Sequence, residues 1–380
     1  MEVDARLAQI ALVSSGAERL AAYAAVLNDV LDARPVSALT EGLVAYVRGA
    51  VLHRVNTAGA GLLMARRLVP ELLEKLIQAH EAIEHPLHSA EVLCDAVLPP
   101  ILSLLEAHAA LWDDELLGWR RWHAQLLEQL ERYGDAARVL QTVTPESMRG
   151  ERNASWPSLC VKVVQLCMAA GDEDAAAHAL KCATAALHTA RDDVALQHDF
   201  SVCQAHWLAL QRRFNDAAQR CLELSASTRF SPKEQGHMAQ LAALHALAAS
   251  PSTARTTLLQ RLAQDERAAS WPFCEALQRA SRGQVLRDAD TQALEGAWHA
   301  CHRTPARYGL SAAALALSEH TLCALARSFS VVPIARLSAH VQLEESVCEK
   351  MVARLVAQGQ FPPGSYVDQV QGVVRRHWRR

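Results

Sequence analysis

Apolar residues recur every three or four positions through the first hundred residues, which is the spacing of one face of an α-helix. The pattern predicts three helices, over about residues 18–31, 39–55 and 62–80. Pro70 is expected to kink or break the third of them. Pro99-Pro100 is predicted to end a further helix and to open the next one. Residues 1–110 are therefore expected to form an N-terminal arm of helical hairpins.

Three segments further along repeat one short motif: ERYGDAARVL (131–140), AGDEDAAAHAL (170–180) and RRFNDAAQRCL (212–222). Their shared Asp-Ala-Ala begins at Asp135, Asp174 and Asp216, which are 39 and 42 residues apart. This period is typical of stacked pairs of antiparallel helices, which bury their apolar faces against neighbouring pairs. Each aspartate is expected to begin a helix, where its carboxylate accepts backbone N–H groups. The sequence predicts a helical-repeat (TPR-like) right-handed solenoid over residues 111–265.

The repeat fades after about residue 265, and a different pattern begins. Helices are predicted near residues 273–282 and 288–301. They are followed by HRTPARYG (302–309), a polar stretch that is predicted to be an exposed loop. We assign residues 266–378 to a C-terminal domain.

The last part of this domain has the order of elements of a winged helix. The pattern predicts three helices and then two short strands, over residues 314–329, 334–341, 345–359, 365–370 and 372–378. Gly359 ends the third helix, and Gln371-Gly372 forms a tight turn between the strands. The winged helix is therefore placed at about residues 314–378, with a small β-hairpin in an otherwise all-α chain.

The composition supports an all-α fold. Hydrophobic residues make up 51% of the chain, but aromatic residues only 5%, and the dominant Ala and Leu are the residues that a helix tolerates best. The ten cysteines contain no C-x-x-C pair, which is typical of reduced, buried thiols. No signal peptide and no apolar run of membrane-spanning length stand out, so no membrane span is expected and the predicted localisation is the cytoplasm and nucleus.

The charge pattern favours protein partners over nucleic acid. The formal net charge is −3 and the isoelectric point about 6.6, which gives no overall attraction to phosphate backbones. The helix that would enter a DNA groove carries three acidic and two basic residues: Glu344, Glu345 and Glu349 against Lys350 and Arg354. The basic tail RRHWRR (375–380) keeps nucleic-acid binding open as an alternative. An exposed wing strand, however, can pair with the sheet edge of another protein.

No motif for catalysis or for metal binding stands out. The histidines of HEAIEH (80–85) are five residues apart, whereas the zinc motif H-E-x-x-H places them four apart, on one helix face. The sequence contains no G-x-S-x-G turn and no Walker lysine. We therefore expect no catalytic site, no cofactor and no metal in this chain.

Four segments resemble a known family: FSVCQAHWLALQRRFNDAAQRCLELS (200–225), QDER (264–267), ALSEHTLCALARSF (316–329) and EKMVARLVAQGQF with YVDQVQGVV (349–374). They resemble the PCI-domain family of the proteasome lid, the signalosome and translation initiation factors. Within that family they are most similar to the fourth subunits of the COP-9 signalosome. The helix with Glu319 and His320 and the wing sequence are the most specific parts, although Thr321 stands where that subfamily has Asn.

This resemblance implies a non-catalytic scaffold subunit. The COP-9 signalosome removes the ubiquitin-like modifier Nedd8 from cullins, and its zinc isopeptidase activity belongs to a different subunit. The implied partners are other PCI-domain and MPN-domain subunits. The N-terminal arm would reach toward the cullin–RING ligase substrate.

The resemblance also implies an interaction surface. The loop at 302–309 matches the position of a family insertion that senses substrate, although a plain solvated loop is an equal alternative. The implied contact residues lie in this loop, in the following helix and in the wing: Arg303, Arg307, Tyr308, Glu319, His320, Tyr366, Asp368 and Gln369. A PCI subunit of the proteasome lid or of an initiation-factor complex, and a winged-helix nucleic-acid-binding protein, remain the alternative functions.

Overall fold

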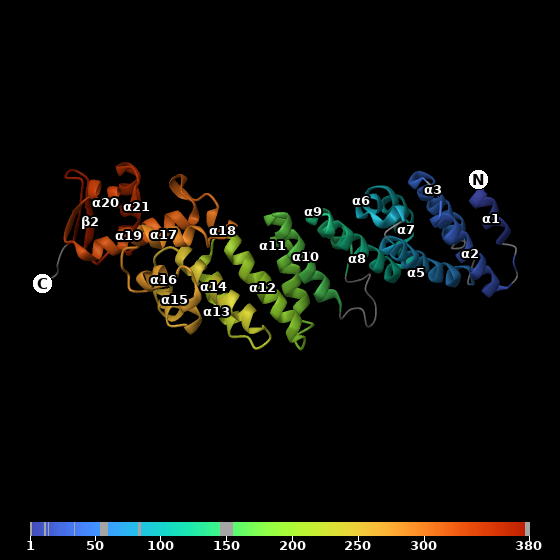
Figure 1. Cartoon of the computed structure of the whole chain (residues 1–380), viewed down its shortest axis with the longest axis horizontal. Helices are drawn as coiled ribbons and strands as arrows, with labels where there is room; N and C mark the ends of the chain where they lie inside the picture. Colours follow the sequence, from blue (N-terminus) through green and yellow to red (C-terminus); the bar gives the residue numbers. More distant parts are fainter. Residues whose placement is uncertain are drawn as a thin grey trace. The chain divides into compact units, whose positions relative to one another are not determined.

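The computed structural model of the chain describes residues 2–10, 13, 15–33, 35–53, 60–82, 85–144 and 155–376. The chain divides into two compact units, Met1–Asp192 (unit 1) and Asp193–Arg380 (unit 2), whose elements are labelled in Figure 1. The three-part division at residues 110 and 265 stays a prediction.

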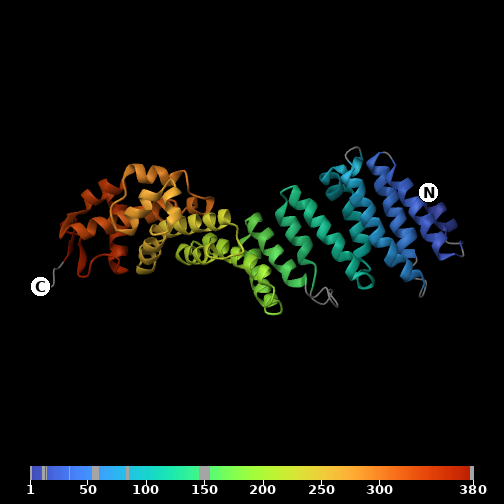
Figure 2. The same ribbon diagram turned by 60° about the horizontal axis from the view of Figure 1, so that its bottom comes forward.

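Unit 1 is helical wherever the structure describes its elements. In chain order these are α1 (Glu2–Ile10), α2 (Gly16–Leu31), α3 (Val36–Tyr46), the π-helix η1 (Val47–Leu52), α5 (Ala60–Glu81), η2 (Pro86–His88), α6 (Ala90–Val92), the π-helix η3 (Leu93–Val97), α7 (Leu98–Glu106), η4 (Ala109–Leu111), α8 (Asp113–Gln129), α9 (Tyr133–Gln141), α10 (Trp156–Ala170) and α11 (Glu173–Leu187). Helix α2 packs against α3 and α5, and α5 packs against α8 (Figure 2).

The helices of the predicted arm form where the apolar spacing places them. Ser15 caps α2 by accepting the N–H of Glu18, and the buried residues of α2 follow a helical stripe: Tyr23, Val26, Leu27, Val30 and Leu31. The helix predicted over 39–55 is α3 continued by η1, and Val55 lies outside the described residues. Helix α5 continues through Pro70, so the predicted kink or break does not end it.

Three helical pairs contain the repeated motif: α8 with α9, α10 with α11 and, in unit 2, α12 (Val194–Leu210) with α13 (Phe214–Ser225). In each pair one left-handed residue precedes the cap of the second helix: Glu131 (φ 57°), Gly171 (φ 73°) and Arg212 (φ 57°). These residues are 40 and 41 positions apart. The structural period is therefore more even than the spacing of the Asp-Ala-Ala motif, because the second motif follows its turn one residue sooner.

The repeated aspartates lie in the first helical turn, as predicted, but their bonds differ from the prediction. Asp135 accepts Nε of Arg132 at 2.9 Å, and Asp216 accepts Nε of Arg213 at 2.8 Å. In the middle repeat the backbone cap is Asp172, which accepts the N–H of Ala175 at 2.9 Å. The aspartate at the expected capping position therefore bonds an arginine side chain in two of the three repeats.

Substitutions at the left-handed turn positions are expected to change stability in opposite directions. Gly171→Ala should lower the free energy of unfolding by about 1 kcal/mol, because a Cβ is unfavourable at this φ. Arg212→Gly should raise it by about 0.5–1 kcal/mol, because it removes that penalty at an exposed site. Urea denaturation of both variants tests this pair, and a shift of both in the same direction would contradict it.

Unit 2 contains the remaining helices and the strands. After α12 and α13 they are α14 (Pro232–Ala248), α15 (Thr253–Ala263), η7 (Glu266–Ser270), α16 (Cys274–Ser281), α17 (Asp288–Glu295), α18 (Ala300–Arg303), η8 (Arg307–Gly309), α19 (Ala312–Ser328), β1 (Val331–Pro333), α20 (Ile334–Val341), α21 (Glu345–Ala357), β2 (Ser365–Asp368) and β3 (Val373–Arg376). Helices α12 to α16 each pack against the next one along the chain.

Two predictions in this region need correction. The single helix predicted over 288–301 is two helices, because α17 ends at the C-cap Gly296 and α18 begins only at Ala300. The loop predicted to begin at His302 begins two residues later, at Thr304, because His302 and Arg303 lie in α18, where His302 is fully buried.

The C-terminal part of unit 2 is a winged helix, as predicted. Helices α19, α20 and α21 cover a three-stranded antiparallel sheet of order β1-β3-β2 (Figure 1). Its core includes one face of α21, formed by Cys348, Met351, Val352 and Leu355 at helical spacing. The predicted all-α fold of helical pairs followed by this module is confirmed; the handedness of the solenoid stays a prediction.

Candidate protein-interaction site

The sheet of the winged helix leaves two edges available. Strands β1 and β2 each pair with β3 on one side. On β1 the side chain of Val331 is 48% exposed, and at the wing turn Val370 is 98% exposed. Large apolar side chains in such positions are costly in water, and a row of free backbone groups can pair with another strand.

The three predicted wing residues differ in availability. Tyr366 is 39% exposed on β2, and Gln369 is exposed in the turn. Asp368 instead faces the hairpin: its Oδ1 accepts the N–H of Gln371 at 3.1 Å, and its Oδ2 lies 3.5 Å from Nε of Arg375. Asp368 therefore shapes the turn that presents Gln369 and Val370.

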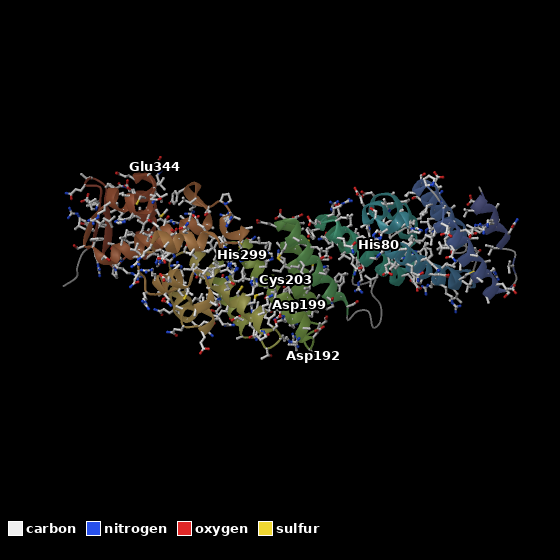
Figure 3. The ribbon with its side chains drawn as sticks, viewed as in Figure 1. His80, Asp192, Asp199, Cys203, His299 and Glu344 are labelled. Atoms are coloured by element: carbon white, nitrogen blue, oxygen red, sulfur yellow. The ribbon has the colours of Figure 1, made fainter. Side chains whose placement is uncertain are left out.

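The exposed side of α21 is not basic. Glu344, which stands at the outer edge of the module in Figure 3, is exposed together with Glu345 and Lys350. Arg354, the other basic residue of this helix, is turned inward and is only 19% exposed. This arrangement disfavours contact with phosphate backbones.

Glu319 and His320 were expected at an interface, but the structure buries both. Glu319 is 1% exposed and pairs with Arg354 of α21. His320 is 5% exposed; its Nε2 donates to the carbonyl of Gln284 at 2.8 Å, and its Nδ1 accepts Nη1 of Arg255 at 3.3 Å. Two adjacent residues of α19 therefore connect this helix to α21 on one side and to α15 and the segment after α16 on the other. Neither side chain is available to a partner in this conformation.

The predicted loop residues lie beside this buried pair. Arg303 is exposed and donates to the carbonyl of Glu295 at 2.8 Å, and Arg307 is exposed as well. Tyr308 has a left-handed backbone (φ 61°), and its half-buried ring lies 6.0 Å from the guanidinium carbon of Arg354. The loop is thereby joined to α21 through Arg354, the residue that also binds Glu319.

Sequence reasoning missed Arg255 and Arg354, although both organise this region. Arg255 is 3% exposed and donates to the carbonyls of Ala246 and Leu247, at the end of α14, at 2.9 and 3.2 Å. Its partner His320 is 65 residues away in the chain, and Glu319 is 35 residues from Arg354. The one signal in the sequence was an ionisable Glu-His pair within an apolar helix, because ionisable side chains that become buried need hydrogen-bond or charge partners.

One histidine cluster lies in the interior of unit 2. Donor atoms of His245, Cys301 and His302 lie within 4.8 Å of one another. Nδ1 of His302 accepts the backbone N–H of His299 (labelled in Figure 3) at 3.1 Å, so its Nε2 carries the proton and donates to Nδ1 of His245 at 2.8 Å. A metal would need the lone pair of that Nε2. The geometry is that of a hydrogen-bonded pair, whose nitrogens satisfy each other in the core.

Three buried histidines are expected to make unit 2 sensitive to acid. Burial lowers the pKa of His245 to about 4, of His302 to about 3 and of His320 to about 4. Nearby histidines lower the pKa of His245 and His302 further, and the positive charges of Arg255 and Arg327 do the same for His320. Above about pH 6.5, the pKa of a histidine in the unfolded chain, these histidines are neutral in both the folded and the unfolded state. Below it the unfolded chain binds protons that the folded chain rejects, so stability falls with decreasing pH, by about 1.4 kcal/mol per pH unit for each histidine.

His320→Gln should therefore reduce this dependence. The glutamine amide stays neutral at all these pH values. The slope of unfolding free energy against pH, between about pH 6.5 and pH 4.5, should therefore decrease by about 1.4 kcal/mol per pH unit, which is the contribution of one histidine. Urea titrations at a series of pH values measure the slope. The exposed His340→Gln variant is the control and should leave the slope unchanged; equal slopes for wild type and His320→Gln would contradict the expectation.

Comparison with known proteins defines the class first. The family model of the PCI domain matches residues 311–378, which are the residues that build α19 to β3. The matched part of the chain is therefore similar to a PCI domain, and it coincides with the winged helix. Among the residues that the structure describes, no helix has the length and apolar character needed to cross a membrane.

The particular relatives share one name. The chain is similar to COP9 signalosome complex subunit 4 of Caenorhabditis elegans, with 21% identity over 323 residues, covering 82% of this chain and 75% of the relative. The subunit of Drosophila melanogaster is 22% identical over 337 residues, with coverages of 88% and 78%. That of Emericella nidulans is 24% identical over 385 residues, with coverages of 98% and 89%. The resemblance predicted from the sequence is confirmed.

Proposed function

We propose that this chain is a non-catalytic scaffold subunit of a COP9 signalosome, the complex that removes Nedd8 from cullins. The observation that carries the proposal is a winged helix with two available sheet edges, matched by the PCI-domain model, in a chain similar to subunit 4 over most of its length. A scaffold needs binding surfaces rather than a reactive centre, and the open edges of β1 and β2 supply such surfaces. The cytoplasm and nucleus are the proposed location.

The wing is proposed to bind other PCI-domain subunits. Val331 on β1 and Val370 at the wing turn are apolar and exposed, and Tyr366 and Gln369 belong to the same β2–β3 hairpin as Val370. Burying such side chains against a partner removes apolar surface from water while the strand edge gains backbone hydrogen bonds. The helical unit 1 is proposed to reach the cullin–RING substrate.

The segment 303–309, which comprises the last residue of α18 and the loop after it, is proposed to bind an MPN-domain neighbour or the substrate. Arg303 and Arg307 offer exposed charge, and Tyr308 connects the loop to Arg354 in α21. A partner that displaces Tyr308 would disturb the residue that balances the buried Glu319. Binding of a partner to the loop would thereby change the contact between α19 and α21 inside the winged helix.

Affinity purification with mass spectrometry tests this function. The tagged wild-type chain should recover other PCI subunits, MPN subunits and cullins, while the purified chain alone should not cleave neddylated cullin. Val331→Asp combined with Val370→Asp should lose the PCI partners, since charge on an edge strand and at the wing tip opposes docking. Val194→Asp, at a site 54% exposed on α12, is the matched control and should keep them.

Other outcomes would point elsewhere. Recovery of proteasome-lid subunits or of ribosomal initiation factors would assign the chain to another PCI complex. Binding of duplex DNA that weakens steeply with salt would indicate nucleic-acid recognition instead. Unchanged partners in the double wing variant would exclude the proposed edge.

A further inference from the structure

A cavity of about 350 Å³ lies within unit 2, between α15, α16, α19 and the segment that follows α21. It is separate from the sheet edges and the segment 303–309. Three arginines and four hydroxyl-bearing residues line it: Arg255, Arg282, Arg327, Ser252, Thr253, Thr256 and Ser281. Among the described residues around it, no Asp or Glu contributes to the lining. The cavity therefore concentrates positive charge and hydrogen-bond donors without a carboxylate to balance them.

Arg255 is a buried member of this lining. Its guanidinium donates to two carbonyl oxygens at the end of α14 and to Nδ1 of His320. Because Nε2 of His320 donates to the carbonyl of Gln284, its Nδ1 is the neutral acceptor and brings no negative charge. The carbonyl groups hold the side chain in place, but its buried charge has no anionic partner among these contacts.

Arg282 and Arg327 are exposed lining residues. No ion pair joins either of them to a carboxylate in the described part of the chain. Gly283 lies between them in the lining, and a Cβ added there would overlap Nη1 of Arg327. The absence of a side chain at this position gives the guanidinium its place at the cavity.

The first turn of α15 faces the same cavity. Ser252 caps this eleven-residue helix by accepting the N–H of Arg255 at 3.0 Å, and Ser252, Thr253 and Thr256 all line the space. A helix N-terminus adds partial positive charge and favours an anion. It acts here together with the arginines rather than alone.

We propose that this cavity binds a small soluble molecule carrying two or more phosphoryl groups. Planar guanidinium groups with several donors suit phosphoryl oxygens, and the volume exceeds what one inorganic phosphate fills while lying at the low end of ligand pockets. Among the described residues of the lining, His320 is the only aromatic ring, and it is buried, so a nucleobase would find no stacking platform. This ligand is additional to the scaffold function and would brace the junction of the helical pairs with the winged helix.

Isothermal titration of the full chain with tripolyphosphate, at about 0.15 M KCl to screen non-specific attraction, tests the proposal. Arg282→Gln and Arg327→Gln should each weaken binding about tenfold or more, as expected for the loss of a charged hydrogen bond. Arg261→Gln removes an exposed arginine of the same helix α15 that does not line the cavity, and should leave the dissociation constant unchanged. Both lining arginines are exposed, so melting of the ligand-free variants should match wild type.

ATP and inorganic phosphate complete the experiment. ATP should bind no more tightly than tripolyphosphate, and inorganic phosphate should bind at least about tenfold more weakly. The proposal is overturned if tripolyphosphate does not bind above the effect of ionic strength, or if the Arg282→Gln/Arg327→Gln double variant binds like wild type. Tenfold tighter binding of ATP than of tripolyphosphate would overturn the inference that a nucleobase finds no stacking platform in the cavity.

Discussion

Replacing Arg354 by methionine is expected to lower the free energy of unfolding by about 3–5 kcal/mol, one of the largest effects of any single substitution in unit 2. Glu319 is 1% exposed, and Arg354 is its ion-pair partner. Its other carboxylate oxygen, Oε2, has no hydrogen-bond partner among the described residues. Methionine fills the volume of the arginine stem but leaves the buried carboxylate without a countercharge, and the desolvation cost of that charge is then uncompensated.

The double variant Glu319→Gln/Arg354→Met separates charge from packing. The double variant has no unpaired buried charge, so it should recover a large part of the unfolding free energy that Arg354→Met loses. The coupling energy between the two sites should exceed about 1 kcal/mol. Arg138→Met is the matched control: that side chain is 78% exposed in its pair with Asp135, so its effect should stay below about 1 kcal/mol. Chemical denaturation measures the wild type, the single variants Glu319→Gln and Arg354→Met, their double variant and the control. A loss as small as that of the control would show that Glu319 reaches water.

Truncating Leu355 to alanine is expected to cost about 2–5 kcal/mol. Leu355 is fully buried on the inner face of α21, in the core that also contains Met351, Val352 and Val374. Removing three carbon atoms there leaves a cavity that neighbouring helices and the sheet close only in part. Because this core holds the sheet against the helices, Leu355→Ala should also weaken the recovery of PCI partners.

Leu63→Ala is the matched control for Leu355→Ala. It makes the same chemical change at a side chain that is 68% exposed, so it should change stability by no more than about 0.5 kcal/mol. Thermal and urea unfolding report both variants. Similar losses of unfolding free energy for the two variants would mean that burial of the leucine does not determine how far its truncation destabilises the protein.

Local pattern was enough to predict the main elements. The helical stripe of α2, the left-handed Gly359 after α21 and the turn at Gly372 all follow from neighbouring residues, so the winged helix could be recognised before its structure was known. Strand β1 was missed because it has three residues, ends in Pro333 and exists only through its pairing with β3.

The buried polar contacts were out of reach of sequence patterns for a different reason. His302 looks like a loop residue because it stands in a polar run, yet its two nitrogens are satisfied by His299 and His245. Which arginine meets Glu319 or His320 depends on how distant helices pack, and the local sequence around Arg354 or Arg255 carries no sign of it. Burial of an ionisable group is a property of the tertiary fold rather than of spacing.

The position of Glu319 and His320 next to each other on α19 has a mechanical consequence. The first holds α21, and the second holds α15 and the segment after α16, through Arg255 and Gln284. Rotation of the winged helix about the axis of α19 would leave the Glu319–Arg354 pair intact and would break the contacts of His320 with Arg255 and Gln284. A force on the winged helix would therefore be passed on to α15 and to the segment after α16, and unit 2 would resist it as one body.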